Sequence, residues 1–231
     1  MSRAKNNHQS SDLAGDVAAV ETVQTAIWKS EFGRDYSDRN TLTTEEVDQL
    51  YMGNYGVTRR AINEAFLRDI ARDASVLEVG CNTGNQLLLL QEMGYKNLSG
   101  IELQPYALEI ARQRLPGVSL QLGSALGLPH EDSTFDLVFT SGVLIHISPT
   151  DLPRAMDEIY RCSRKYIWAL EYYAPEVTEV TYRSHTGLLW KMDYARRYLE
   201  RFPDLELVRE QRVPYLKNEN IDTVFLLKKR A

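Results

Sequence analysis

The chain has 231 residues, which corresponds to one large domain or to one domain with an appendage. Hydrophobic residues make up 43% of it and charged residues 26%, a balance that argues against a disordered chain, a fibre or a coiled coil. The 27 Lys and Arg residues are outnumbered by 32 Asp and Glu residues, so the formal net charge is −5. The strong basic surplus that is typical of a nucleic-acid-binding protein is absent, and nucleic acid is not the expected partner.

The cysteines and the apolar runs indicate the cellular compartment of the protein. Cys81 and Cys162 provide neither a disulfide framework nor the ligand spacing of a zinc site, so we expect a reduced, cytoplasmic protein without a bound metal. Residues 1–16 lack the apolar core of a signal peptide. No apolar run approaches the ~20 residues that span a bilayer, so no membrane partner is expected.

The first third of the chain predicts a helical cap. Residues 1–15 are polar and are expected to form a disordered tail. The apolar spacing predicts helices over residues 16–30, from Thr43 or Thr44 onwards, and over residues 58–71. The aromatic and charged segment WKSEFGRDYSDRN, residues 28–40, fits neither the helical nor the strand period. We expect residues 16–72 to form this cap.

The rest of the chain alternates between two kinds of segment. Short apolar runs predict strands at residues 76–79, 97–102, 118–122, 135–140 and 165–171. Helical segments lie between them, which predicts a parallel sheet covered on both faces. A helix is then expected at residues 193–201, followed by strands at 205–213 and 223–229 that pair antiparallel. Residues 73–231 are expected to form one α/β unit with the cap.

The strongest motif is VLEVGCNTGNQLLLL at residues 76–90, an apolar strand followed by a glycine-bearing turn and a helix. Ligands of open α/β sheets bind beyond the carboxyl ends of the strands, and glycine lets them approach the main chain closely. Glu102 ends the next strand, 18 residues after Gly84, and its carboxylate can accept both hydroxyls of a ribose. Asn82 and Asn85 stand where a dinucleotide fingerprint needs glycines, so a nucleoside without a pyrophosphate fits better.

These blocks, with GSALGLPHEDSTFDLVFTSGVLIHI after them, resemble class I S-adenosylmethionine-dependent methyltransferases over about residues 75–171. The resemblance implies an α/β fold with a Rossmann-like seven-stranded sheet, mostly parallel, whose last strand is antiparallel. It also implies S-adenosylmethionine as the cofactor, with S-adenosylhomocysteine as its product. The cofactor-binding residues that it implies are Glu78, Gly80, Cys81, Asn82, Thr83, Gly84 and Asn85 around the methionine part, Glu102 on the ribose, Leu103, Ser124 and Ala125 at the adenine, and Ser141, Gly142 and Val143 on the methionine side.

A narrower resemblance covers most of the chain. Residues 28–40, together with VLIHISPTDLPRAMDEIYRCSRKYI, YRSHTGLLWKMDYA and FPDLELV, are similar to bacterial methylases encoded with pseudaminic acid biosynthesis. This resemblance implies a small-molecule acceptor such as a sugar, a sugar nucleotide or a surface-glycan group, phosphorylated or not. The family's naming rests on genomic association, so it does not itself establish the acceptor.

Candidate catalytic residues follow the expected fourth and fifth strands. A hydroxyl or ammonium acceptor loses a proton during methyl transfer, so a base helps the reaction. His146 is a candidate base or a structural histidine, and His185 is a candidate base or substrate contact. Glu171, Tyr172 and Tyr173 either close the site around the acceptor or pack as ordinary core and surface residues.

Four arginines and one aromatic residue complete the predicted set. Tyr36 is expected to cover the sulfonium by a cation–π contact and Arg39 to meet the methionine carboxylate, the alternative being a packing role for this segment. Arg183 is a candidate partner for an anionic acceptor or a surface ion pair. Arg59 and Arg60 open a helix and predict a solvated face.

Two other functions stay open at this level. One is a methyltransferase that acts on RNA, since residues 183–231 carry 11 Lys or Arg against 7 Asp or Glu. The other is a non-catalytic nucleoside-binding protein, because methyl transfer demands no single indispensable side chain. The sequence does not distinguish oxygen from nitrogen acceptors, and it does not specify an oligomeric state.

Overall fold

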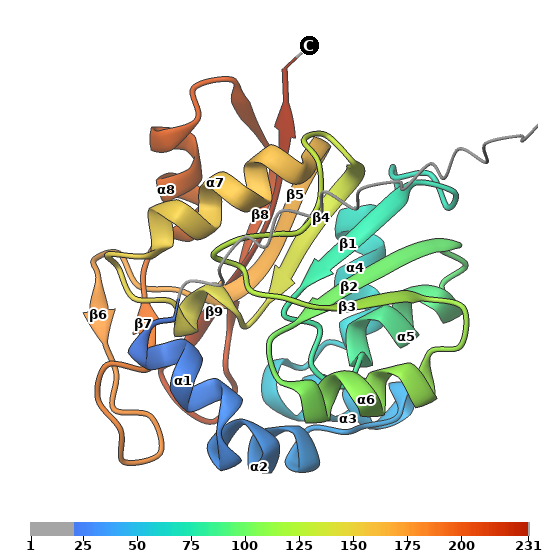
Figure 1. The fold of residues 1–231 in the computed structure, drawn as a ribbon. Helices are drawn as coiled ribbons and strands as arrows, with labels where there is room; N and C mark the ends of the chain where they lie inside the picture. The colour runs from blue at the N-terminus through green and yellow to red at the C-terminus, as the bar shows by residue number, and fades with distance from the viewer. Residues whose placement is uncertain (1–20, 231) are drawn as a thin grey trace, which may run out of the picture.

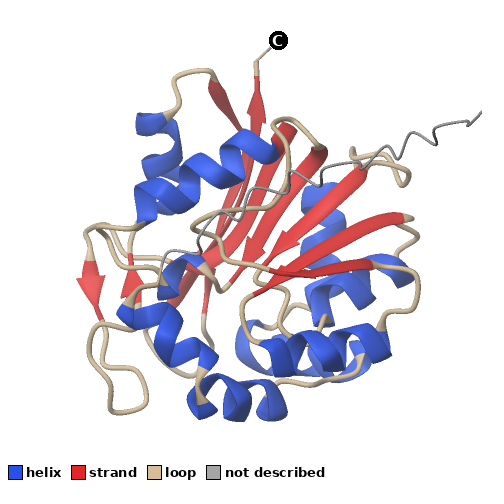
Figure 2. Ribbon diagram, in the orientation of Figure 1, coloured by secondary structure: helices blue, strands red, loops and turns tan. Residues whose placement is uncertain are grey.

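The computed structural model describes residues 21–230 (Figure 1). The predicted tail at residues 1–15 and the start of the helix predicted at residue 16 lie outside the described residues. The described chain is built around one central sheet with helices on both of its faces, as Figure 2 shows.

The central sheet has seven strands in the order β3-β2-β1-β4-β5-β9-β8. Its strands are β1 (Ser75–Val79), β2 (Asn97–Glu102), β3 (Ser119–Leu122), β4 (Phe135–Ser141), β5 (Ser163–Tyr172), β8 (Leu205–Pro214) and β9 (Ile221–Lys229). The first five pair parallel, whereas β9 pairs antiparallel with both β5 and β8. The predicted seven-stranded sheet with a reversed last strand is confirmed, as is the antiparallel pair at the end of the chain.

The helices divide between the two faces and one edge of the sheet. They are α1 (Val23–Lys29), α2 (Glu31–Arg39), α3 (Thr44–Tyr55), α4 (Arg59–Leu67), α5 (Asn85–Glu92), α6 (Pro105–Arg114), α7 (Leu152–Cys162) and α8 (Tyr194–Arg201), with a short 3-10 helix at Leu144–His146. Figure 1 shows α1 and α2 lying across the edge toward which the parallel strands point. A small hairpin, β6 (Thr178–Glu179) with β7 (Trp190–Lys191), stands beside α1.

Alternation along the strands separates the core into two layers. Leu77 and Val79 of β1 pack with Met156 and Ile159 of α7, whereas Val76 packs on the opposite face with the α4 and α5 side chains. Successive residues of a strand point to opposite faces, so a short run that is apolar throughout is buried on both sides. This pattern is the reason why β1, β4 and β5 read as continuous apolar runs in the sequence.

Local capping explains where the N-terminal helices begin. The Ser30 hydroxyl accepts the Phe32 N–H, at an N-to-O distance of 3.3 Å, and separates α1 from α2. The Thr43 hydroxyl accepts the Glu46 N–H and the Glu46 carboxylate accepts the Thr43 N–H, a capping box that starts α3. The expectation that residues 28–40 lack a helical period was wrong, because this interruption at Ser30 divides the segment between two short helices.

None of the helices in residues 21–230 is long and apolar enough to cross a membrane.

Candidate active site

A cavity of about 370 Å³ opens at the carboxyl ends of the parallel strands, beneath α1, α2 and α3. Pockets of this size and position are where open α/β sheets bind their ligands. Of the residues predicted from sequence, the following line it: Tyr36, Glu78, Gly80, Cys81, Asn82, Asn85, Glu102, Leu103, Ser124, Ala125, Ser141, Gly142, Val143, His146, Glu171 and Tyr172. The tertiary structure therefore brings the separate sequence blocks to one place.

The turn between β1 and α5 depends on two glycines. Gly80 has φ +74°, and a Cβ there would lie 2.6 Å from a methyl group of Val143. Gly84 has φ +83°, and a Cβ there would lie 2.3 Å from a methyl group of Leu115. Any side chain would meet both a strained backbone and a clash, so these two positions require glycine. The turn thereby lies close against the neighbouring loop and leaves its main chain facing the cavity.

Glu102 ends β2 with its carboxylate in the cavity wall and is 7% exposed. One oxygen accepts the Asn82 N–H and the other accepts the Gln104 N–H, each at an N-to-O distance of 2.7 Å. Burial raises the pKa of Glu102, and the backbone amides oppose that rise. Each carboxylate oxygen has further acceptor capacity, so this position fits the two hydroxyls of a ribose.

Glu78 and Cys81 lie deeper in the same turn. The Glu78 side chain is 3% exposed, and its Oε2 has no hydrogen-bond partner among the described residues. Burial holds its pKa well above the ordinary value, while the nearby charge of Arg59 lowers it. Burial also raises the pKa of the Cys81 thiol well above its ordinary value, so Cys81 stays uncharged and unreactive.

Hydrogen bonds join the N-terminal helices to the segments that follow β1 and β2. The Asn82 side chain donates to the Ser37 hydroxyl at 3.1 Å, and the Asn85 side chain donates to the Asn40 carbonyl at 2.6 Å. The Gln104 side-chain amide donates to the Trp28 carbonyl at 3.1 Å. These contacts position α1 and α2 over the cavity, and they connect residues that lie 45 to 76 positions apart.

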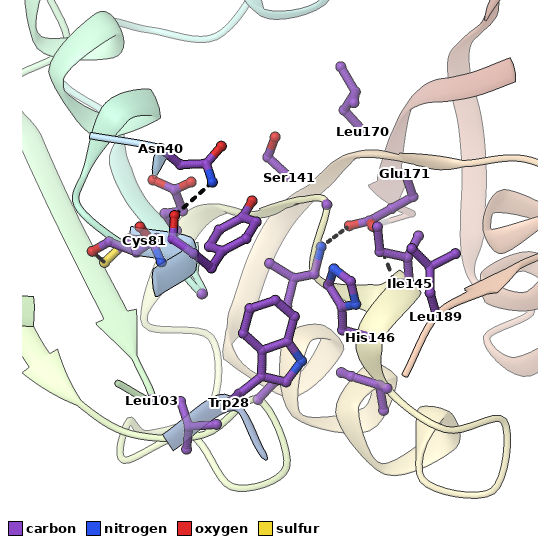
Figure 3. A pocket seen from close by; sticks show the side chains of 18 of the residues that line it. Trp28, Asn40, Cys81, Leu103, Ser141, Ile145, His146, Leu170, Glu171 and Leu189 are labelled. Atoms are coloured by element: carbon purple, nitrogen blue, oxygen red, sulfur yellow. Dashed lines mark hydrogen bonds between the residues drawn. The ribbon is translucent and has the colours of Figure 1, made fainter. Parts of the chain in front are cut away.

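The Trp28 indole and the His146 imidazole form an aromatic wall, which Figure 3 shows. Their ring centres lie 4.6 Å apart, and His146 Nδ1 lies 2.7 Å from the Leu188 carbonyl oxygen. A carbonyl oxygen accepts, so Nδ1 carries the hydrogen and Nε2 is the unprotonated nitrogen. Burial lowers the pKa of His146 to about 4, so the ring is neutral at physiological pH and is a weak base.

Glu171 supports the loop after β4. Its carboxylate accepts the Val143 N–H at 3.2 Å and the Ile145 N–H at 3.4 Å, as the dashed lines in Figure 3 indicate. The side chain is fully buried, and burial raises its pKa to about 7. Because both oxygens are engaged by the loop, this arrangement does not support the predicted contact of Glu171 with a substrate.

A second polar cluster has no signal in the sequence; we call it the tyrosine–aspartate group, and it consists of Tyr55, Tyr172, Tyr215 and Asp222. The Tyr55 hydroxyl lies 2.6 Å from both Asp222 Oδ2 and the Tyr215 hydroxyl, which in turn lies 3.3 Å from the Tyr172 hydroxyl. All four residues line the cavity. Only Tyr172 was predicted, because the four come from α3, β5, the β8–β9 loop and β9 and share no local motif.

Arg59 corrects another expectation. It was predicted on a solvated face, yet its side chain is fully buried. Its Nη1 donates to the Tyr51 hydroxyl at 2.6 Å and to the Ser141 hydroxyl at 3.0 Å, and its Nε donates to Asn63 Oδ1 at 2.9 Å. The guanidinium also stacks near the Trp168 ring, 5.1 Å from its centre. Arg60, in contrast, is partly exposed and pairs with Glu92.

Three predicted residues lie on the exposed surface. Arg183 and Ser184 have φ of +49° and +67° and form the tight turn of a hairpin tip, which leaves Arg183 and His185 exposed. The His185 ring packs against Phe32, with 5.3 Å between ring centres. Arg39 is exposed on α2. Their predicted contacts with the acceptor or the methionine carboxylate are not supported by these positions.

Three other predicted residues, Thr83, Gly84 and Tyr173, are not among the residues that line the cavity. Tyr173 is covered by the Arg212 guanidinium, 3.6 Å from its ring centre. The Thr83 carbonyl oxygen accepts a hydrogen bond from Arg114 Nη1, at the end of α6, at 2.7 Å. Gly84 serves as the first residue before α5. The cofactor contacts predicted for Thr83 and Gly84, and the substrate contact predicted for Tyr173, stay predictions.

Comparisons with known proteins agree with this architecture. Residues 76–165 match the family described as methyltransferase domain. Malonyl-[acyl-carrier protein] O-methyltransferase of Serratia marcescens is 36% identical over 89 residues, 38% of this chain and 34% of that protein. Demethylmenaquinone methyltransferase of Symbiobacterium thermophilum is 33% identical over 94 residues, 37% of each. The chain thus spans about a third of the length of these curated relatives.

The fold extends the likeness over most of the chain. The 1,6-didemethyltoxoflavin-N1-methyltransferase of Burkholderia thailandensis, solved with 1,6-didemethyltoxoflavin and S-adenosylhomocysteine, superposes with a TM-score of 0.68 at 20% identity, covering 89% of this chain and 88% of that one. The domain match covers residues 76–165, and the solved structure shares the fold over most of the chain. In the present chain, the acidic end of β2 and the glycine turn line the cavity of this shared fold.

Within residues 21–230, no group of three or more His, Cys, Asp or Glu side chains is placed so that it could hold a metal ion.

Proposed function

We propose that this chain transfers a methyl group from S-adenosylmethionine to a small-molecule acceptor, a sugar or a sugar-linked group with a free hydroxyl or amine. The observation that carries the proposal is the convergence of Glu102, the Gly80 turn and Ser141 on one cavity that the helices α1–α3 cover. When bound, the cofactor supplies an already activated methyl group, so the protein mainly binds, aligns and shields the reactants. We take residues 16–72 as the cap and 73–231 as the methyltransferase unit of this enzyme.

The proposed roles divide the cavity into three parts. Glu102 accepts the ribose hydroxyls, and Leu103, Ser124 and Ala125 contact the adenine. The turn at Gly80 and Asn82, with Ser141 to Val143, holds the methionine part. The Tyr36 side chain lines the cavity, and its ring centre lies 5.2 Å from that of Trp28, a position suited to cover a sulfonium by a cation–π contact.

The choice of a sugar as acceptor rests on the resemblance to methylases encoded with pseudaminic acid biosynthesis. The helices α1 and α2 lie across the edge of the sheet at which the cavity opens, and this arrangement supports a small acceptor over a polymer. Aromatic side chains with polar tips, such as those of the tyrosine–aspartate group, suit a ligand that has both hydroxyl groups and apolar ring faces.

Calorimetric titration tests the cofactor half of the proposal. We expect S-adenosylmethionine and S-adenosylhomocysteine to bind and NAD to give no heat. Incubation with cofactor that carries a deuterated methyl group, followed by mass spectrometry of candidate sugars and of RNA, tests the transfer. Binding without transfer to any acceptor would favour a non-catalytic nucleoside-binding protein, and transfer to RNA alone would contradict the small-molecule assignment.

A further inference from the structure

The end of the cavity beyond β5 is built around one buried carboxylate. Asp222 is the second residue of β9 and lies opposite Tyr172 of β5, and Leu170 of β5 lies opposite Ser141 of β4. Neighbouring strands are ~4.8 Å apart, so Asp222 lies four strand spacings, roughly 19 Å, along the sheet edge from Glu102 on β2. With the nucleoside at β2 and the methionine part between β1 and β4, the space over β5 and β9 is left for the acceptor.

The hydrogen bonds of Asp222 leave one oxygen for a ligand. The side chain is 3% exposed and lines the cavity, and its Oδ2 accepts the Tyr55 hydroxyl at 2.6 Å. Its Oδ1 is buried and has no hydrogen-bond partner among residues 21–230. A buried carboxylate oxygen without a donor is costly, which makes Oδ1 the natural acceptor for a hydroxyl or ammonium hydrogen.

The three tyrosines fix that carboxylate in place. Each phenol has one hydrogen to donate, and when Tyr55 donates to Asp222 its oxygen is free to accept from Tyr215. The Tyr215 hydroxyl also lies 3.5 Å from Asp222 Oδ2, and Tyr172 extends the chain into the cavity. Burial raises the pKa of Tyr172, so this hydroxyl remains a neutral donor and acceptor.

The charge of the cavity restricts what can bind there. Five carboxyl groups line it, those of Glu78, Glu102, Asp151, Glu171 and Asp222, and no lysine or arginine within residues 21–230 does. Two cations lie near this end but are not among the lining residues. The Arg59 guanidinium donates to Tyr51 and Ser141, and its Nη2 has no partner among the described residues. The Lys191 ammonium donates to Asn220 and lies 5.3 Å from the centre of the Tyr172 ring. At this end, a phosphate or carboxylate on the acceptor would face the Asp222 carboxylate, and it would meet no lysine or arginine in the described lining of the cavity.

We propose that the tyrosine–aspartate group binds the reacting end of the acceptor, that this end is a hydroxyl- or ammonium-bearing ring without negative charge, and that Asp222 takes its proton. This inference rests on the proposed methyl transfer and narrows it to an acceptor class. The acceptor oxygen or nitrogen forms the bond to the methyl carbon, the carbon–sulfur bond of the donor breaks and leaves its electron pair on sulfur, and the proton passes to the Asp222 carboxylate.

Two variants test the role of Asp222. The acceptor source is a small-molecule extract of the cells in which this protein naturally occurs. With this extract, Asp222→Asn should lower the rate of transfer of a deuterated methyl group by roughly 100-fold or more, the usual rate loss when a general base is removed. Its dissociation constant for S-adenosylhomocysteine, measured by calorimetry, should stay within about twofold of the wild type. The matched control is Glu219→Gln, an exposed carboxylate three residues away, which should leave both values unchanged.

Tyr55→Phe keeps the carboxylate and removes only its donor, so it tests the group even where Asp222→Asn fails to fold. We expect about a tenfold loss of transfer at unchanged cofactor affinity. In the wild type, the rate of transfer should also decrease at pH values under about 6. Asp222 becomes protonated there, since burial raises its pKa to about 6. The groups that face it are Tyr55, Arg59, Tyr172, Lys191 and Tyr215. Full transfer by both variants, or a parallel loss of cofactor binding, would overturn the proposed role.

The labelled product tests the acceptor class separately. Fragmentation mass spectrometry identifies the ring that carries the deuterated methyl group. A neutral or amine-bearing ring supports the inference, and a ring that itself bears a phosphate, sulfate or carboxylate overturns it while leaving methyl transfer established. Normal binding of S-adenosylhomocysteine with no labelled product in the extract would instead overturn the proposed function, and this inference with it.

Discussion

Glu102 offers the sharpest test of the cofactor site. Its two oxygens accept the Asn82 and Gln104 amides at 2.7 Å each, and their remaining acceptor capacity is proposed to serve the ribose. Glu102→Gln keeps the size of the side chain and one carbonyl oxygen, but it replaces the other oxygen by an NH₂ group. The new NH₂ group would face the N–H donor of one of the two backbone amides. The side chain would also lose its charge and one acceptor for the ribose hydroxyls.

The expected loss follows from these contacts. A hydrogen bond to a charged group contributes about 1.5–3 kcal/mol. At 1.4 kcal/mol for each factor of ten, the dissociation constant for S-adenosylhomocysteine should rise roughly ten- to hundredfold. The assay is calorimetric titration, with a thermal melt of the same sample to detect a general loss of folding.

Glu109→Gln is the matched control, because Glu109 is an exposed acid on α6 whose ion pair with Arg112 lies at the surface. Surface pairs contribute little, so its affinity should equal that of the wild type. An unchanged affinity of Glu102→Gln in a folded sample would refute the assignment of the ribose to this carboxylate. An equal loss in Glu109→Gln would show that the effect is not specific to the site.

Three further predictions concern stability and the exposed histidine. Burial raises the pKa of Asp222 to about 6, above its unfolded value near 4, so its ionisation lowers the unfolding free energy as the pH rises through that window. In urea titrations, Asp222→Asn should therefore gain stability relative to the wild type between pH 4 and 7, on the order of 2–3 kcal/mol, and a constant difference would contradict the raised pKa. Arg59→Ala should lower the unfolding free energy by about 3 kcal/mol, because it removes a buried cation with four hydrogen-bonding or stacking partners, whereas the exposed Arg68→Ala should not. His185→Ala should change methyl transfer by less than about threefold, as for other surface substitutions, and a larger loss at normal stability would restore the sequence-based prediction for this residue.

Much of the fold was predictable because its signals are local. The apolar runs of β1, β4 and β5 are short and bounded by turn residues, and the helix over Leu152–Cys162 has a continuous periodic pattern. The Gly80 turn was readable for the same reason, since the strand, the turn and the helix that shape it are contiguous. Segment 28–40 was harder to read, because a cap at Ser30 divides it into two helices shorter than the window that reveals a period.

In the candidate site too, the residues with a local sequence signal could be predicted and the others could not. Glu102 and the turn around Gly80 could be proposed from the sequence, because each stands at a fixed place after a strand. Asp222 and Tyr55 gave no signal: 167 residues separate them, and neither belongs to a motif. Arg59 looked like any charged residue at the start of a helix, and only the packing of α4 against β4 and β5 buries it beside Ser141 and Trp168.

The sequence by itself determined the sheet, the turn around Gly80 and the acidic residue at the end of β2, since hydrophobic periodicity and backbone conformation act over a few neighbouring residues. Only the tertiary structure decided which polar residues share the cavity, because hydrogen bonds such as that from Tyr55 to Asp222 form between segments that meet after the sheet is assembled. The same assembly turned Arg183 and His185 outward at a hairpin tip and enclosed Arg59, and so decided which charges a ligand can meet.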